Sequence, residues 1–364
     1  MIKPLKNKRK FNNNLLKCCM WNIEGLNQEK ANDPHFQNII SEFSILSFVE
    51  TWMGGDAENV IISNFEKIHS SCRKKHRKAR RYSGGINIYA KNSAISGISV
   101  IKNTHPDILW IKLDQTFFKL EKSIYLAIVY ISPANSNVNY DVDNVYSVLL
   151  SDVVKFSRLG EIIIQGDFNA YTNTQPDFID FDDKSKHVNI DDAYYKSDHI
   201  SLRNNHDKKH INGSGKHLLN LCKETSTRIL NGRTTGDLMG RPTCITYNGS
   251  SVVDYSIVSR DLISSVGYFK VHDFTSLSNH CPISLALYAD VNTASFHTNY
   301  KFDPLPGKFI WTNESICSYR ETLENKVFRE KIKAFNDASF TDSDSITESF
   351  SSIIVDAAKQ SVKS

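Results

Sequence analysis

The sequence predicts an α/β protein, and three observations support that prediction. Short apolar runs rich in β-branched residues alternate with segments of helical periodicity along most of the chain. The chain has 364 residues, of which 40% are hydrophobic and 11% aromatic, so it can bury a sizeable core. Strand signals stop after about residue 290, which suggests that a domain ends there.

The predicted strands are bounded by polar and turn-forming residues, as buried strands usually are. They comprise residues 15–23, 44–49, 85–89, 108–113, 123–131, 161–165, 244–247, 252–258 and 281–287. Apolar residues at spacings of three and four predict helices at residues 34–43, 145–156 and 215–224, and one amphipathic helix at 318–335.

These elements suggest three parts of the chain. Residues 1–14 are basic and Asn-rich and are expected to form a disordered tail, and residues 15–290 are expected to form one domain. Residues 291–364 are expected to form a helical or partly disordered extension. Within the domain, residues 181–216 are polar and are expected to make a long surface excursion.

Composition excludes several classes of protein. The formal net charge is only +4, which by itself does not indicate a nucleic-acid-binding protein. The seven cysteines are odd in number and form no CxxC pair, so a zinc ribbon or a disulfide framework is not expected. Neither a secretory signal nor a run of about 18 apolar residues occurs, so we expect an intracellular protein that does not enter a membrane.

Polar side chains gather where predicted strands begin or end. They are Asn22, Glu24, Glu50, Tyr130, Asp167, Asn169, Asp254, Asn279 and His280. Such groups converge on one edge of a sheet, which is where α/β folds build their sites. Carboxylate and amide oxygens suit a hard cation such as Mg²⁺, and a histidine oriented by a carboxylate can carry a proton near neutral pH.

Each of these residues also has an ordinary structural explanation. Glu50 can be a solvated residue at a strand end, the Gly-Asp-Phe-Asn segment at 166–169 can be a turn, and a histidine before a strand is more often structural than catalytic. Asp254 lies in an apolar strand, where a buried carboxylate needs a partner. The prediction of a functional site therefore rests on the occurrence of all these residues together, in this order along the chain.

Seven separated segments in this order resemble the endonuclease/exonuclease/phosphatase superfamily. They are Trp-Asn-Ile-Glu-Gly (21–25), Glu-Thr-Trp (50–52), Gly-Gly (84–85), Tyr-Ile-Ser-Pro (130–133), Gly-Asp-Phe-Asn (166–169), Val-Asp-Tyr (253–255) and Ser-Asn-His-Cys-Pro-Ile (278–283). The resemblance covers residues 15–288 and implies a four-layer α/β sandwich with two central, mostly antiparallel β-sheets flanked by helices.

Further segments are most similar to the apurinic-type endonuclease domains of non-LTR retrotransposons. They are Asn-Gly (212–213), Leu-Leu-Asn-Leu-Cys (218–222), Ile-Leu-Asn-Gly-Arg (229–233), Gly-Asp (236–237) and Gly-Arg-Pro-Thr (240–243). The extension after residue 290 resembles the linker that leads to a reverse transcriptase in those proteins. We expect the reverse transcriptase itself to be absent.

The resemblance also implies a role for each site residue. Glu50 is the principal ligand of Mg²⁺ or Mn²⁺, with Glu24, Asn22 and Asn279 beside it. Asp167 positions or deprotonates the attacking water, and Asn169 and Tyr130 hold the scissile phosphate. His280 contacts a phosphate oxygen while Asp254 fixes its ring. No small-molecule organic cofactor is expected.

One position departs from the superfamily pattern. The superfamily has Ser-Asp-His before Cys-Pro-Ile, whereas this chain has Asn279 in the middle. The substitution keeps an oxygen ligand but removes one negative charge, so we expect weaker metal binding. The Ser-Asp-His at residues 197–199 is interpreted as a coincidence, because it lies in the polar excursion with no strand after it.

A basic segment is the strongest indication of a nucleic-acid partner. Residues 73–81 contain seven lysines or arginines, Arg73, Lys74, Lys75, Arg77, Lys78, Arg80 and Arg81. They predict contact with DNA phosphates or a nuclear-import signal, and the alternative is a solvated loop. Five of the twelve histidines lie between His187 and His217, but without an HExxH pattern a zinc site is not expected.

The sequence therefore predicts a metal-dependent phosphodiesterase that cleaves a DNA backbone and acts in the nucleus. Two alternatives remain. One is a phosphatase or RNA exonuclease of the same fold, and the other is a catalytically silent nucleic-acid-binding relic, which Asn279 would explain.

Overall fold

The computed structural model describes residues 15–54, 59–75, 77, 79–133, 140–179, 202–289, 312–338, 340 and 343–362. The chain divides into two compact units, residues 1–294 and 295–364. The tail expected at residues 1–14 and the domain boundary expected near residue 290 lie outside the described residues. Of the polar excursion expected at residues 181–216, residues 202–216 are described, and Arg203, Asn205 and Asp207 among them are buried.

The first unit contains two six-stranded sheets. The first sheet has the order β13 (Val266–Val271), β14 (Ile283–Tyr288), β1 (Leu15–Asn22), β2 (Ile45–Val49), β4 (Ile86–Lys91) and β3 (Phe65–Ser71). The second has the order β5 (Ile98–His105), β6 (Ile108–Leu113), β7 (Ile124–Tyr130), β8 (Glu161–Asp167), β12 (Asp254–Ser259) and β9 (Thr227–Ile229). A separate hairpin joins β10 (Cys244–Thr246) to β11 (Gly249–Ser251).

Each sheet has one parallel pair at its centre, β1 with β2 and β7 with β8. The other pairs of the two sheets are antiparallel. The mostly antiparallel character that the sequence predicted is therefore confirmed. Because the two halves share this pattern, the carboxyl ends of β1, β2, β7 and β8 are available to build one shared site.

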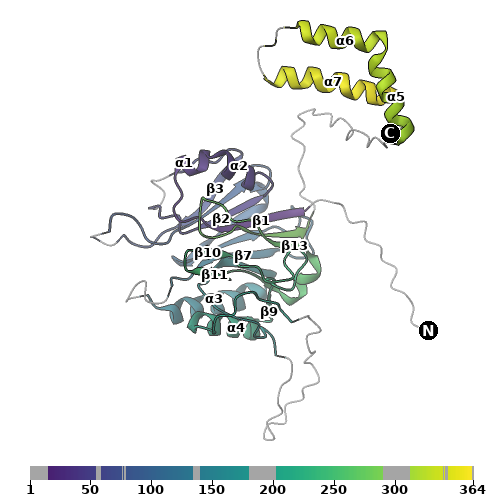
Figure 1. Cartoon of the computed structure of the whole chain (residues 1–364). Helices are drawn as coiled ribbons and strands as arrows, with labels where there is room; N and C mark the ends of the chain where they lie inside the picture. The colour runs from purple at the N-terminus through teal and green to yellow at the C-terminus, as the bar shows by residue number, and fades with distance from the viewer. Residues whose placement is uncertain are drawn as a thin grey trace, which may run out of the picture. The chain divides into compact units, whose positions relative to one another are not determined.

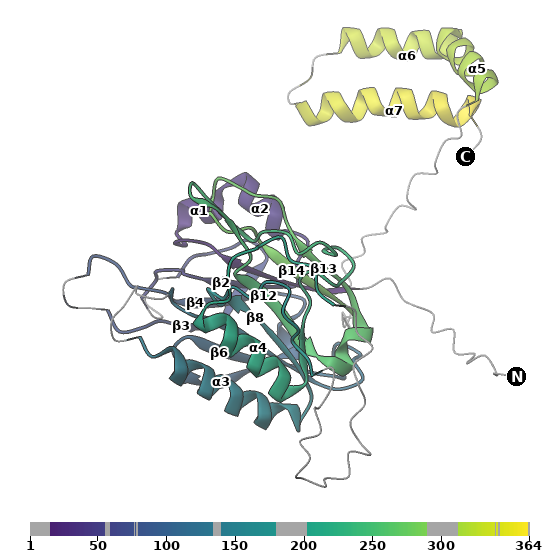
Figure 2. The same ribbon diagram turned by 60° about the horizontal axis from the view of Figure 1, so that its bottom comes forward.

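Helices cover the outer faces of the sheets (Figure 1). The first sheet is covered by α1 (Gln28–Asn32) and α2 (Pro34–Ile40), and the second by α3 (Val142–Ser157) and α4 (Gly213–Thr225). Figure 2 shows α3 and α4 side by side below the second sheet. Short 3₁₀ helices occur at Ile95–Gly97 and Arg260–Ser265. The result is the predicted four-layer sandwich.

Alternation along β1 shows why the layers form. Leu16, Cys18 and Met20 are buried in the core between the two sheets, whereas Cys19 and Trp21 are buried in the core beneath α2. Successive side chains of a strand point to opposite faces, so a strand buried on both faces needs a continuous apolar run. The sequence around residues 15–23 has that character, which made the strand predictable.

The second unit consists of α5 (Asn313–Glu324), α6 (Lys326–Asp337) and α7 (Ser343–Ser361). Its small core contains Phe328, Ile353 and Ala357. The single helix predicted at residues 318–335 is wrong, because the chain leaves the helical conformation at Asn325 (φ −66°, ψ 160°). The Asn325 side chain instead accepts a hydrogen bond from the Phe328 backbone and begins α6, a common use of asparagine.

Among the described residues, every helix is too short or too polar to cross a membrane.

Candidate active site

The fold brings the predicted polar residues to one edge of the two sheets. Asn22, Tyr130 and Asp167 are the last residues of β1, β7 and β8, and Glu50 directly follows β2. The strands β12 and β14 run antiparallel to these strands, so their first residues lie at the same edge. Asp254 begins β12 opposite Asp167, and His280 shortly precedes β14.

Asn22 lies at the centre of this group and connects its carboxylates. Its amide nitrogen donates to Asp167 Oδ2 at 2.9 Å and to Glu50 Oε1 at 3.1 Å. The amide oxygen accepts from the Glu24 backbone nitrogen at 3.2 Å. Asn22 is completely buried, so these bonds are shielded from water. In this arrangement Asn22 acts as a donor that aligns Asp167 and Glu50.

Glu50 is held by neutral donors on both carboxylate oxygens. The Tyr130 hydroxyl donates to Oε1 at 2.8 Å and the Trp52 indole to Oε2 at 3.2 Å. Among the described residues, no lysine or arginine forms an ion pair with Glu50 or Glu24. The Lys30 ammonium interacts with the Glu24 charge but donates to backbone carbonyls, including those of Ile23 and Leu277. The two half-buried carboxylates therefore keep a net negative charge that a divalent metal would balance.

Glu24 contacts Asn279 through several hydrogen bonds. The Asn279 amide nitrogen lies 3.0 Å from both carboxylate oxygens of Glu24, and its backbone nitrogen lies 2.9 Å from Oε2. The Ser278 hydroxyl, which donates to the Asn22 carbonyl at 2.7 Å, anchors this segment. Asn279 thus presents its amide nitrogen to Glu24, and rotation of the amide would be needed to present its oxygen to a metal.

Several of these residues have a left-handed backbone. The φ angles are 46° at Glu24, 52° at Glu50, 56° at Trp52 and 44° at Asn169. Non-glycine residues in this region cost on the order of 1 kcal/mol each and tend to cluster at functional sites. Backbone hydrogen bonds hold the Glu50 loop in place, including Trp52 nitrogen to Gly84 oxygen at 2.9 Å.

His280 and Asp254 form a buried pair. The His280 Nδ1 lies 2.8 Å from Asp254 Oδ2, and the side chains are 10% and 1% exposed. Burial alone lowers the pKa of His280, but the Asp254 charge and hydrogen bond overcome it and raise that pKa well above the usual value. The Asp254 carboxylate thus favours the protonated imidazole, whose Nε2 lies 3.5 Å from the Asn22 amide nitrogen.

Among the described aspartates and glutamates, Asp167 is the one whose pKa the surroundings clearly shift. Burial, followed by the charge of Asp254, raises the pKa of Asp167 to about 7, although His280 and the Asn169 backbone nitrogen act against the shift. Asn169 donates from its backbone to Oδ1 at 3.0 Å, and its amide donates to the Ile131 carbonyl at 2.9 Å. A carboxylate with a pKa near neutrality can accept a proton during a reaction.

A metal ion fits this site by the chemistry of its donors. Glu50 and Glu24 supply carboxylate oxygens that form no direct ion pair with a described lysine or arginine, which suits Mg²⁺ or Mn²⁺. A second group, Asp167, Asp254 and His280, has its ligand atoms within 4.8 Å of one another. His280 Nδ1 and Asp254 Oδ2 are already bonded to each other, so the Glu50 side is the better candidate.

The basic segment lies beside this site and is only partly exposed. Lys74, Lys75, Arg77, Arg80 and Arg81 are exposed, whereas the Arg73 side chain is only 14% exposed. Lys78 lies outside the described residues. The Arg81 guanidinium stacks on the Trp52 ring at 3.4 Å, and Trp52 is the residue that donates to Glu50. The segment therefore borders the proposed metal ligand.

The other sequence candidates do not join this group. His206 and His210 are exposed, and neither belongs to a potential metal-binding cluster of the described residues. His187 and the Ser-Asp-His at residues 197–199 lie outside the described part of the chain.

Three supporting residues were not assigned a role from the sequence. Asn212 donates to the Asn169 carbonyl at 2.8 Å and accepts from Tyr171 and Gly215 backbone nitrogens, which joins the start of α4 to the Asn169 loop. Trp52 donates to Glu50, and Trp21 donates to the His280 carbonyl at 2.7 Å. All three residues stand in segments that carried the family resemblance, but the sequence pattern gave no indication of these contacts.

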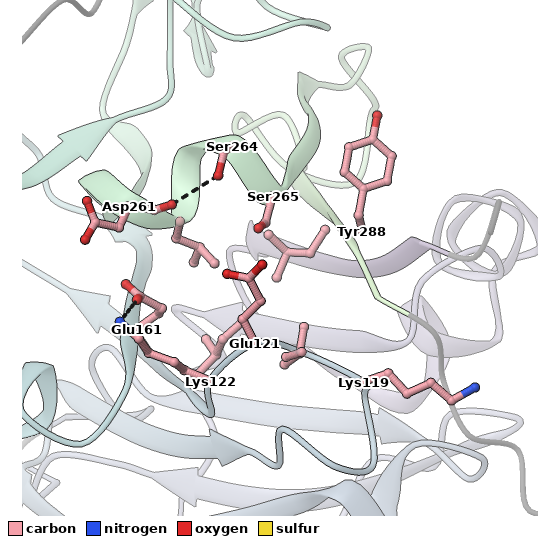
Figure 3. A pocket seen from close by; sticks show the side chains of 12 residues that line it. Lys119, Glu121, Lys122, Glu161, Asp261, Ser264, Ser265 and Tyr288 are labelled. Carbon is pink, nitrogen blue, oxygen red and sulfur yellow. Dashed lines mark hydrogen bonds and ion pairs between the residues drawn. The ribbon is translucent and has the colours of Figure 1, made fainter. Parts of the chain in front are cut away.

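A separate cavity of about 370 Å³ lies at the opposite ends of β7 and β8 (Figure 3). It is bordered by Lys122, Glu161, Asp261 and Tyr288, among others, and Lys122 and Glu161 pair at 2.7 Å. Among the described residues, none of the buried polar side-chain atoms without a partner lines it. We assign it no role in the chemistry.

Comparison with known structures identifies the fold. The chain resembles the AP endonuclease from Leishmania major with a TM-score of 0.54 and 14% identity, covering 75% of this chain and 87% of that chain. It also resembles the endonuclease domain of TRAS1, a telomere-specific non-LTR retrotransposon (TM-score 0.46, 13% identity, 75% and 98% covered). A 3′-5′ exonuclease from Neisseria meningitidis matches with TM-score 0.48 and 13% identity, covering 75% and 99%.

The fold is that of the endonuclease/exonuclease/phosphatase superfamily, as the sequence motifs indicated. No protein-family model matches the sequence, and no curated protein sequence matches it significantly. The likeness therefore rests on the fold.

Proposed function

We propose that this chain is a divalent-metal-dependent phosphodiesterase that cleaves a DNA backbone. The observation that carries the proposal is the set of contacts around Asn22, which joins Glu50 to Asp167 within reach of the His280–Asp254 pair. One cation-binding carboxylate, one carboxylate able to accept a proton and one protonated histidine are the groups that phosphodiester hydrolysis requires.

Glu50 and Glu24 would hold the metal, with Asn22 and Asn279 beside them. A bound Mg²⁺ or Mn²⁺ would supply Lewis-acid stabilisation of charge on the phosphate and on the leaving oxygen. Tyr130 and Asn169 would orient the phosphate, because their hydroxyl and amide groups lie at the same sheet edge as Asp167. Holding the reacting groups in line lowers the entropic part of the barrier.

Asp167 would accept the proton of the attacking water. The Asp167 carboxylate is ionised above a pH of about 7, so it can act as a base at slightly alkaline pH. The protonated His280 would donate a hydrogen bond to a phosphate oxygen and stabilise the developing negative charge. Asp254 would fix the His280 ring through Nδ1.

The exposed cations of the basic segment favour DNA as the substrate. Arg81 lies against Trp52 beside the site, and we propose that it and the other exposed cations, Lys74, Lys75, Arg77 and Arg80, contact phosphates of the bound strand. We place the catalytic domain at residues 15–290 and propose action in the nucleus. The sequence segments at 212–243 favour a retrotransposon-type endonuclease.

The contact between Asn279 and Glu24 suggests that the enzyme is impaired. Asn279 leaves the site with one carboxylate fewer than the superfamily pattern and donates to a carboxylate that would otherwise face the metal. Weaker metal binding follows, and in the extreme case the domain binds DNA without cutting it.

The proposal can be tested with supercoiled plasmid and Mg²⁺ at pH 7.5. The full chain should nick the plasmid, and His280→Ala should abolish nicking, while the exposed His206→Ala serves as the matched control and should leave it unchanged. Asn279→Asp should increase the rate and lower the Mg²⁺ concentration needed.

Four other outcomes identify the alternatives. Activity gained only with Asn279→Asp would show a site silenced at one ligand. Phosphate release from inositol phosphates without plasmid nicking would favour a phosphatase, and degradation of RNA alone would favour an RNA exonuclease. Binding of plasmid without nicking by any folded variant would contradict the enzymatic proposal.

A further inference from the structure

Arg73 differs from the other basic residues of its segment. Its side chain is 14% exposed, whereas Lys74, Lys75 and Arg77 are exposed. The guanidinium donates from Nε to Asp107 Oδ1 at 2.7 Å and from Nη1 to the Ser132 hydroxyl at 2.7 Å. Because two of its three nitrogens are bonded to protein groups, Arg73 is poorly placed to contact DNA as the others do.

The Arg73 guanidinium also packs against two aromatic rings. It lies 5.1 Å from the centroid of Tyr130 and 4.5 Å from the centroid of Tyr140. The third nitrogen, Nη2, is buried and has no hydrogen-bond acceptor among the described residues. The guanidinium is therefore held by Asp107, Ser132 and the faces of the two rings.

Gly84 leaves the space for this packing. Its φ is +68°, and a Cβ built there would lie 3.2 Å from the Tyr130 ring and 3.5 Å from the Arg73 Cζ. A larger residue would be strained in this conformation and would press on both groups. The Gly-Gly segment thus has a second use besides its backbone bond to the Glu50 loop.

The partners of Arg73 hold the Tyr130 backbone as well. The Tyr130 nitrogen donates to the Asp107 carbonyl at 3.0 Å, and the Tyr140 hydroxyl donates to the Tyr130 carbonyl at 3.2 Å. Asp107 is 1% exposed, so its ion pair with Arg73 is shielded from water. Arg73 thus joins the ring of Tyr130 to the groups that fix its main chain.

We propose that Arg73 is a positioning residue that holds Tyr130, so that the Tyr130 hydroxyl reaches Glu50 Oε1 at 2.8 Å. The inference rests on the proposed function for its catalytic consequence. Arg73 acts through Tyr130, whereas its exposed neighbours act through the DNA. Lysine could keep the charge but could not span Asp107, Ser132 and two rings at once.

A double-mutant cycle tests the inference. The variants are Arg73→Ala, Tyr130→Phe and their double mutant, with Arg73→Lys as the conservative change. Arg77→Ala represents loss of a DNA contact, and the exposed His206→Ala is the control. We expect Arg73→Ala to lower kcat by about 10- to 100-fold with KM nearly unchanged, as a small misplacement does. The double mutant should be no slower than Tyr130→Phe, and Arg73→Lys should recover only part of the rate.

Salt dependence separates positioning from DNA contact. Arg77→Ala should reduce the salt slope of DNA binding by about 1, whereas Arg73→Ala should leave the slope unchanged. Additive losses in the cycle, or a raised KM with a reduced salt slope for Arg73→Ala, would overturn the inference.

Failure of the proposed function gives a different result. If the wild-type chain nicks no DNA, the cycle is measured as melting temperatures of the same four proteins. Non-additive losses between Arg73→Ala and Tyr130→Phe would still support positioning, and additive losses would contradict it. If Arg73→Ala does not fold, Arg73→Lys takes its place in both cycles.

Discussion

The amide nitrogen of Asn279 lies 3.0 Å from each carboxylate oxygen of Glu24, across 255 positions of the sequence. The amide group occupies the face of Glu24 with a neutral donor, and the donors to Glu50 among the described residues are neutral as well. A cation that binds Glu24 must displace the Asn279 amide from it, which opposes metal binding.

Asn279→Asp should weaken the metal-free protein and strengthen metal binding. Two carboxylates would face each other at about the present 3 Å, so we expect a loss of about 1–2 kcal/mol of unfolding free energy in EDTA. Mn²⁺ affinity measured by calorimetry should rise roughly tenfold, because the site gains a charge. The exposed Asn248→Asp is the control and should change neither quantity. An unchanged Mn²⁺ affinity for Asn279→Asp would contradict the prediction.

Asp167→Asn should abolish activity and stabilise the metal-free protein at alkaline pH. The pKa of Asp167 is raised from 3.8 to about 7, so the folded state favours the protonated carboxyl. The stability that this preference gives is present below pH 4 and is lost as pH rises through 7. Above pH 7 the Asn variant should be more stable on the order of 1–3 kcal/mol.

Urea unfolding in EDTA from pH 4 to pH 8 measures this difference. The exposed Asp273→Asn provides the control, since its side chain is 92% exposed. Equal stability of wild type and Asp167→Asn at pH 8 would show that Asp167 is ionised in the folded protein at little cost.

His272 should make the fold sensitive to acid. Burial, aided by the charge of Lys270, lowers the pKa of His272 to about 4, and its Nε2 lies 2.7 Å from the Ser284 hydroxyl. The stability that neutral His272 gives is present above pH 6.5 and is lost as pH falls through 4. We expect wild type to lose about 1–3 kcal/mol over this window relative to His272→Gln.

The measurement for His272 is urea unfolding at pH 7, 5.5 and 4 in EDTA. The unfolding free energy of His206→Gln, at an exposed position, should change with pH as that of wild type does. If the unfolding free energy of His272→Gln changed with pH in the same way, the predicted loss would not come from His272.

Substitutions at Asn212 should separate stability from activity. Its side-chain oxygen caps α4 through Gly215, and its amide nitrogen donates to the Asn169 carbonyl. Asn212→Ala removes both and should lower stability by about 1 kcal/mol. Asn212→Asp keeps the cap but loses the amide donor, so it should remain nearly as stable while kcat falls about tenfold.

Melting temperature and single-turnover plasmid nicking distinguish these effects. A loss of kcat that tracked melting temperature in both variants would indicate that Asn212 acts through general stability alone.

The sequence predicted the central strands well and the edge strands poorly. Strands β1, β2, β7 and β8 are buried on both faces, which requires the continuous apolar runs that were recognised. By contrast, β3 (Phe65–Ser71) and β5 (Ile98–His105) are mostly half-buried or exposed. They contain polar residues and no continuous apolar run, so the sequence did not predict them as strands. Edge strands lack a second neighbour, and pairing with β4 and β6 defines them instead.

The separation of α5 from α6 at Asn325 was also not predictable from the apolar pattern. Apolar periodicity continues from α5 into α6, so the pattern alone predicts one helix. The chain breaks into two helices because the Asn325 side chain caps the start of α6. An asparagine can also lie inside a helix, so its presence in the sequence does not by itself predict such a break.

The sequence by itself determined the fold class and placed the carboxylates, amides and histidine at strand ends, because burial and strand period are encoded locally. Only the tertiary structure decided which of those groups meet. Asn22 and Asp167 are 145 positions apart, and Asn279 and Glu24 are 255 positions apart. Hydrogen bonds depend on distances of a few tenths of an ångström, and packing of two sheets, rather than any local pattern, fixes such distances.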